Sequence, residues 1–290
     1  MALSAVRDTG GTAGSTPGGP TGGGSAGAGE ARRLVSAALR SAVRGTLVVA
    51  HRDVLRQVRH PGVVVAQAAQ IVFFVLVYAV GFRSMIGSVG GVSFGAYVYP
   101  GIIAIQVVML GVGTGLTYAM DREFGVLREM QVAPVPRMCL PLGKILASCV
   151  LLTAQAMLML LPAPLLGLPL TPARYAAGTA VYLATAAAFS LIGLLLAVSV
   201  RRIETLQATV QLAMYPLLFL SGSVFRPDAV PGWLAALMRL NPMMYAVDLA
   251  RHVLLPSAPG VSYLPVWRDL LVIAALVAAA SAALRLRVGR

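Results

Sequence analysis

The stretch YVYPGIIAIQVVMLGVGTGLTYAM, residues 97–120, contains no charged side chain. An α-helix needs about 20 apolar residues to cross the hydrocarbon core of a bilayer, so this stretch predicts a transmembrane helix. The whole chain has the same character, because 58% of its 290 residues are hydrophobic and only 11% are charged. Soluble domains are about 45–50% apolar and about 25% charged. The composition therefore excludes a soluble enzyme and a disordered chain.

Five further apolar stretches surround the first one. They comprise residues 63–82, 145–168, 175–200, 205–224 and 266–286. The last stretch has the shortest uncharged run, but Trp267 can anchor one end while Arg285 and Arg287 reach the opposite interface. We therefore predict an all-α polytopic membrane protein with six transmembrane helices.

Two segments precede the first predicted span. Residues 1–30 are rich in glycine and lack the apolar core of a signal peptide, so they predict a disordered tail. Residues 31–62 alternate leucine and valine with arginine at helical spacing and end at Pro61-Gly62. This pattern predicts an amphipathic helix in the cytoplasmic interface of the membrane. Residues 63–288 then form the membrane domain.

The basic residues indicate the orientation in the membrane. Six spans place both termini on one side, and only six of the 23 Lys and Arg residues lie on the other side: Arg83, Arg174, Arg226, Arg239, Arg251 and Arg268. The positive-inside rule then predicts a multi-pass protein of the plasma membrane with both termini in the cytoplasm. The net charge of +13 is accordingly assigned to contact with anionic lipid, and no nucleic-acid partner is expected.

The loop before the last predicted span is unusually apolar. Its apolar pieces, residues 230–238 and 242–247, are too short to cross the bilayer, so we predict a re-entrant hairpin on the external face. Asp248 and Arg251 are three residues apart and are predicted to pair on one helical face. Two interpretations stay open, an external loop stabilised by that pair and an outer gate.

Motifs of nucleotide and metal binding are absent from the sequence. There is no HExxH and no GxxxxGK[ST], so the chain cannot bind ATP through a P-loop of its own. The two cysteines and three histidines are scattered, and no metal site or bound cofactor is expected. The predicted spans also lack internal charges, which argues against an ion-coupled transporter. We expect no enzymatic activity in this chain and an energy source in a partner.

The segment DREFGVLREMQVAPVPR, residues 121–137, separates the second and third predicted spans. Phe124, Leu127 and Met130 recur every three residues, which is typical of one helix face. Asp121 is predicted to cap the start of this helix and Pro134 to end it. The segment is then either a solvated loop helix or a docking surface for a cytosolic protein.

Three local patterns, in this order on six predicted spans, resemble a known family. They are Arg59-His60-Pro61-Gly62, then Asp121-Arg122-Glu123-x-Gly125-x-Leu127 through Ala133-Pro134-Val135-x-Arg137 with Gly143-Lys144, and finally Leu220-Ser221-Gly222-x-x-Phe225 through Pro231 to Asn241-Pro242-x-x-Tyr245-Ala246-Val247-Asp248-x-x-Arg251. From about residue 32 onward the chain resembles the permease subunits of ABC-2 type ABC transporters. Among these it is most similar to the drug-efflux permeases of the daunorubicin-resistance kind.

The resemblance implies an assembly and two functional regions. Two permeases, identical or different, pair with two ABC ATPase subunits, which carry the ATP and Mg. The segment between the second and third spans would couple to the ATPase, and the external hairpin would form a gate. The coupling residues would be Asp121, Arg122, Glu123, Gly125, Leu127, Pro134 and Arg137. The gate residues would be Phe225, Pro231, Trp233, Asn241, Pro242, Tyr245, Asp248 and Arg251.

The resemblance also implies a substrate pathway along the second and fifth spans. The candidates there are Gln106, Thr114, Gln207, Gln211, Met214 and Tyr215. Alternatively, such polar residues only form hydrogen bonds between neighbouring helices. The run Gly111-x-Gly113-x-Gly115 indicates close helix packing.

The predicted function is export of an amphipathic small molecule, a drug or natural product, by alternating access. Two alternatives stay open. One is a polysaccharide or lipid-linked glycan exporter of the same family, which the few aromatic residues in the spans disfavour. The other is a membrane scaffold that assembles partners without transport.

Overall fold

The structure is a computed structural model, and it describes residues 24–77, 88–89, 91–125, 138–168, 170–223, 225–255 and 260–288. Contacts divide the chain into two compact units at Arg40. Residues 24–40 are helical and belong to the first unit, so this helix begins inside the predicted tail. All packing described below lies in the second unit, residues 41–288.

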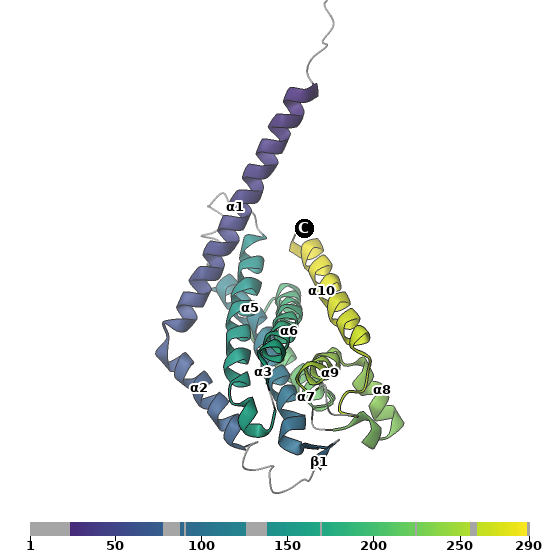
Figure 1. The fold of residues 1–290 in the computed structure, drawn as a ribbon. Coiled ribbons are helices and arrows are strands. Elements are labelled where there is room, and N and C mark those ends of the chain that lie inside the picture. The colour runs from purple at the N-terminus through teal and green to yellow at the C-terminus, as the bar shows by residue number, and fades with distance from the viewer. Residues whose placement is uncertain are drawn as a thin grey trace, which may run out of the picture. The chain divides into compact units, whose positions relative to one another are not determined.

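Helices make up most of this unit, as predicted, and Figure 1 shows their arrangement. The α-helices are α1 (Gly24–Val58), α2 (Pro61–Leu76), α3 (Phe94–Glu123), α5 (Cys139–Leu160), α6 (Pro172–Ser199), α7 (Ile203–Phe219), α8 (Gly232–Leu240), α9 (Pro242–Leu254) and α10 (Val266–Val288). The 3-10 turns η2 (Ala163–Leu166) and η3 (Pro227–Ala229) and a two-stranded antiparallel ribbon, β1 (Ser88–Val89) with β2 (Val92–Ser93), complete the described elements.

Four helices in the described part of the chain are long and apolar enough to cross a membrane. These are α3, α5, α6 and α10. They coincide with four of the predicted spans. Three agree to within three residues at each end, whereas α5 begins six residues and ends eight residues before the predicted 145–168. At the two other predicted spans, the described part of α2 has 16 residues and α7 has 17. The six-span count and the re-entrant hairpin stay predictions.

The centre of the unit is the crossing of α3 over α6 (Figure 1). A Cβ atom on Gly115 would overlap the carbonyl oxygen of Gly193, and one on Gly193 would overlap that of Val112. A Cβ on Gly111 would make a tight contact of 3.3 Å with the Cβ of Phe189, whereas no atom of the described residues lies within 4 Å of a Cβ on Gly113. The predicted packing role is therefore confirmed for Gly111 and Gly115 but is wrong for Gly113. Small residues allow two helix backbones to approach this closely.

Two buried tyrosines also connect α3 to its neighbours α5 and α6. The Tyr182 hydroxyl donates to the carbonyl oxygen of Pro100 at 3.0 Å, and the Tyr99 hydroxyl donates to that of Met159. Both side chains are fully buried. A buried hydroxyl without an acceptor is costly, so these bonds fix how α3 lies between α5 and α6.

The segment after the second predicted span differs from the prediction. Asp121 does not start a new helix, because α3 continues through it and ends at Glu123. Gly125 follows with a φ of 81°, a left-handed conformation that suits glycine and turns the chain away. The physical reason is burial, since Asp121 lies inside the helix bundle next to partners from two other helices. Leu127, Met130, Pro134 and Arg137 lie outside the described residues.

Candidate functional site

A cluster of charged side chains joins three helices at the end of α3 where Asp121 lies. The Lys144 ammonium of α5 lies 2.6 Å from an Asp121 oxygen and 3.2 Å from an Asp53 oxygen of α1. Arg52 and Arg56 of α1 also approach Asp121, at 3.5 and 3.6 Å. These five residues are called the ion cluster below. Only 5% of the Lys144 side chain and 7% of the Asp121 side chain is exposed, so water screens these charges little.

Gly143 explains why the ion cluster forms. A Cβ atom at this position would lie 2.6 Å from the Cβ of Val49, so only glycine lets α1 lie this close to α5. Asp53 follows Val49 by one helical turn and therefore reaches Lys144, the neighbour of Gly143. The sequence analysis missed this cluster because it placed Lys144 just outside a span. One feature could have revealed it, because Asp53 is the only acidic residue between positions 31 and 120.

Arg122 connects the same end of α3 to the end of α6. Its guanidinium donates to the carbonyl oxygens of Ala197, Val200 and Arg201 at 2.9, 3.0 and 2.8 Å. The last carbonyls of a helix lack partners within the helix and carry partial negative charge, so a cation is favourable there. Asp121 and Arg122 together hold α3 to α1, α5 and α6.

The residues that follow Arg122 face outward. Glu123 is exposed, and 75% of Phe124 is exposed. Of the seven predicted coupling residues, the structure thus places two in contacts between helices, exposes Glu123 and puts Gly125 at the turn. The exposed Glu123 and Phe124 thus lie at the end of the described range 91–125.

A cavity of about 530 Å³ lies beside the ion cluster, between α1, α2, α3 and α5. Its polar lining includes Gln57, Gln67, Thr114, Thr117, Ser148 and Gln155, and its apolar lining includes Leu110, Met120, Phe124, Ala147, Leu151 and Leu152. The Nε2 atom of Gln155 is buried and has no hydrogen-bond partner. The volume and mixed lining are those of a small-molecule site.

The predicted pathway residues fall into two groups. Gln207, Gln211 and Tyr215 are exposed along one face of α7. In contrast, Gln106, Thr114 and Met214 are buried. The Thr114 hydroxyl lies 2.6 Å from that of Ser148 and also lines the cavity. The structure therefore brings Thr114 to the cavity but does not bring the six residues to one surface.

The predicted gate residues surround α8 and α9. Phe225, Pro231 and Trp233 are exposed, Pro242 is the first residue of α9, and the Tyr245 hydroxyl donates to the Arg239 carbonyl. Asn241 lies between the two helices. Its side-chain oxygen accepts from the Met243 amide and caps α9, while its Nδ2 donates to the Leu217 carbonyl of α7 at 2.7 Å. Asn241 thereby fixes the start of α9 to the end of α7.

Asp248 and Arg251 do not pair as predicted, because each has backbone partners from another segment. Arg251 is 1% exposed and donates to the carbonyl oxygens of Tyr97 at 3.3 Å and Ser223 at 2.9 Å. Its guanidinium also lies 4.0 Å from the centre of the Tyr97 ring. Asp248 accepts the amide hydrogens of Tyr263 and Leu264. The two charges therefore fix α9 to α3 on one side and to the start of the α10 segment on the other.

Comparison with known proteins places these features within a family model. Residues 44–255 match the model described as ABC-2 type transporter. The chain is 26% identical over 235 residues to the daunorubicin resistance ABC transporter permease protein DrrB1 of Streptomyces coeruleorubidus, covering 78% of this chain and 82% of that protein. It is 27% identical over 159 residues to the putative transport permease ycf38 of Cyanophora paradoxa, covering 54% of this chain and 55% of that protein. The matched region contains the ion cluster, the cavity and the α8–α9 hairpin.

Proposed function

The chain belongs to the ABC-2 type transporter family, and from this premise we propose that it is the permease subunit of an ATP-driven exporter in the plasma membrane. It moves an amphipathic small molecule, a drug or natural product, out of the cell by alternating access. Two copies of a separate ABC ATPase bind ATP and Mg and supply the energy, since this chain has no P-loop. The similarity to a permease named for daunorubicin resistance supports this cargo class.

The observation that carries the proposal is the polar face of α7. Of its 17 residues only Leu206 and Met214 are buried, while Gln207 and Gln211 present amide groups on an exposed face. Amides are poorly accommodated by lipid and find partners in another helix or in water. A second permease, with a pathway between the two α7 faces, satisfies them. The second permease is either another copy of this chain, which gives a homodimer, or a related chain, which gives a heterodimer.

The cavity supports an amphipathic cargo. Leucine and methionine side chains form part of its wall, while amides, hydroxyls and the ion cluster form the rest. Sugars bind on stacked aromatic rings, and Phe124 is the one aromatic side chain among the described lining residues. This lining favours a hydrophobic compound over a glycan.

Cysteine cross-linking tests the α7 interface. In a chain whose Cys139 and Cys149 are replaced by serine, we expect Gln211→Cys to form a disulfide-linked dimer in intact membranes. The measurement is the dimer band on a non-reducing gel after mild oxidation. The matched control is Leu271→Cys, an exposed position on α10 that should stay monomeric. Equal cross-linking at both positions contradicts the α7 interface, and no cross-linking at Gln211→Cys contradicts an α7 interface between two copies of this chain.

Coupling to the ATPase is tested at Glu123. We expect Glu123→Ala to lose ATP-driven daunorubicin transport in inverted membrane vesicles at least tenfold while the amount of permease stays unchanged. The reason is that Glu123 is exposed at the end of α3, so its loss removes a contact to the ATPase and leaves the fold intact. Arg137→Ala is predicted to act in the same way.

The control for this experiment is Glu204→Ala, another exposed acid, which should transport normally. Affinity purification of the tagged wild-type chain should recover a P-loop ATPase in equal amount, and Glu123→Ala should recover less. Full transport by Glu123→Ala contradicts the coupling role. Absence of any ATPase after cross-linking in membranes would favour the scaffold alternative.

A further inference from the structure

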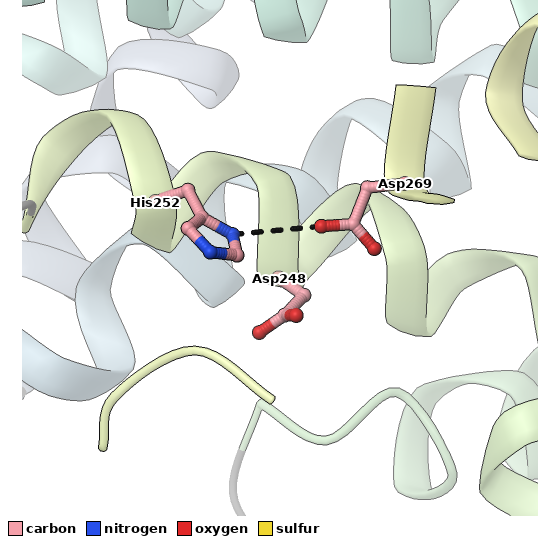
Figure 2. A group of neighbouring side chains, drawn as sticks. All are labelled: Asp248, His252 and Asp269. Carbon is pink, nitrogen blue, oxygen red and sulfur yellow. Dashed lines mark ion pairs between the residues drawn. The ribbon is translucent and has the colours of Figure 1, made fainter. Parts of the chain in front are cut away.

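Asp248, His252 and Asp269 lie together at the junction of α9 and α10, although the spacing of the histidines predicted no metal site. Asp248 and His252 are four residues apart and therefore lie on the same side of α9. Asp269 belongs to the first turn of α10, and Figure 2 shows its carboxylate turned toward the His252 ring. One ligand atom from each of the three residues lies within 4.8 Å of the others.

The burial of Asp269 is the second observation. Its side chain is 0% exposed, and neither carboxylate oxygen has a hydrogen-bond partner among the residues that the structure describes. Nδ1 of His252 lies 3.5 Å from an Asp269 oxygen, and this nitrogen has no hydrogen-bond partner among the described residues either. A buried carboxylate is strongly unfavourable unless another charge or donor compensates it. The arrangement leaves two electron-pair donors facing each other in the interior.

The separation between His252 and Asp269 suits two ligands of one bridging ion. Zinc bonds to histidine nitrogen and carboxylate oxygen are about 2.0–2.2 Å long, so two ligand atoms of a tetrahedral site lie about 3.3–3.5 Å apart. The 3.5 Å between His252 Nδ1 and the Asp269 oxygen agrees with this separation. Asp248 is already oriented by the amides of Tyr263 and Leu264, as ligating carboxylates usually are by neighbouring donors.

The charge of the three side chains also supports a bound cation. Two carboxylates and a neutral imidazole carry a charge of −2, which a divalent cation balances. Arg251 is the nearest fixed cation on α9, but its guanidinium donates to the carbonyls of Tyr97 and Ser223. Imidazole with carboxylates is a ligand set that suits Zn²⁺. We propose that Asp248, His252 and Asp269 bind a Zn²⁺ ion that joins α9 to α10, with a water molecule in the fourth position.

Cobalt binding tests the site on the purified full-length chain in detergent. After treatment with EDTA, we expect one equivalent of Co²⁺ to give the visible absorption of a tetrahedral site, and one equivalent of Zn²⁺ to displace it. His252→Asn and Asp269→Asn should abolish the band. His51→Asn and His60→Asn, at the two other histidines, should keep it.

A second measurement does not depend on the fold of any variant. X-ray absorption at the zinc edge of the wild-type protein should show one imidazole with oxygen ligands. Sulfur ligands, which only Cys139, Cys149 or methionine can supply, or a second imidazole would overturn the proposal. So would the absence of stoichiometric Co²⁺ binding, or an unchanged band in His252→Asn. The site is independent of the cargo, so its failure leaves the proposed transport function intact.

Discussion

The Gly115→Ala variant will lose the packing of α3 on α6, and we expect it to unfold in detergent at a markedly lower temperature than the wild type. The added methyl group would overlap the carbonyl oxygen of Gly193, which is backbone and cannot turn aside as a side chain can. Overfilling a packed interior costs about 1–3 kcal/mol where side chains can adjust, so we expect about 3 kcal/mol or more here. Gly193→Ala should behave similarly, because its methyl group would meet the Val112 carbonyl.

Gly113→Ala is the matched control for this prediction. It lies on the same helix two residues away, and no atom in the described part of the chain is within 4 Å of the added atom. Alanine is a better helix former than glycine, so this variant should be as stable as the wild type or more stable by about 0.5–1 kcal/mol. The measurement is thermal unfolding followed by intrinsic fluorescence, together with size-exclusion profiles, for the wild type and each of these glycine variants. Equal melting of Gly115→Ala and Gly113→Ala would mean that the helices do not cross at this point.

The Lys144→Met variant is expected to have the second large effect. Methionine keeps the length of the side chain but removes the ammonium between Asp53 and Asp121. Removing one partner from a buried ion pair costs about 3–5 kcal/mol, because the other charge stays behind without compensation. We expect low yield of folded protein, early thermal unfolding and loss of ATP-driven transport, since α1, α3 and α5 are no longer held together.

An exposed ion pair provides the comparison for Lys144→Met. Arg226 and Asp228 are 3.1 Å apart with side chains 37% and 61% exposed. Such surface pairs contribute about 0–1 kcal/mol, so Arg226→Met should unfold close to the wild type. Replacing Asp53 and Asp121 by asparagine in the Lys144→Met background should restore part of the stability. If Lys144→Met is as stable as Arg226→Met, the ion cluster does not hold these helices.

The apolar helices could be predicted closely from the sequence. The predicted stretch 175–200 corresponds to α6 (Pro172–Ser199), whereas α5 ends eight residues before the predicted residue 168. Hydropathy identifies such helices because the bilayer requires each one to be apolar along its whole length. It does not reveal where a helix ends in a charged segment, so the continuation of α3 through Asp121 was missed.

The contacts of the site could not be predicted, because the partners lie far apart in the sequence. Lys144 and Asp53 are separated by 91 positions, and Arg122 reaches carbonyls 75 to 79 residues away. Local spacing instead favoured a pair between Asp248 and Arg251. Burial overrides that expectation, because a fully enclosed charge is stabilised by whichever groups surround it in the fold. Helical spacing could predict that Gln207, Gln211 and Tyr215 share one face of a helix, but the exposure of that face depends on how α7 packs in the fold.

Arg251 has a consequence for how the chain is made. Its guanidinium is enclosed by the backbone and ring of Tyr97, which leaves the ribosome 154 residues earlier, and by the Ser223 carbonyl. A permanently charged side chain is strongly disfavoured in the bilayer by itself. Helix α9 can therefore pack in its final position only after α3 is inserted, because α3 supplies the Tyr97 carbonyl that accepts from Arg251. Biogenesis is thus ordered from the first half of the chain to the second.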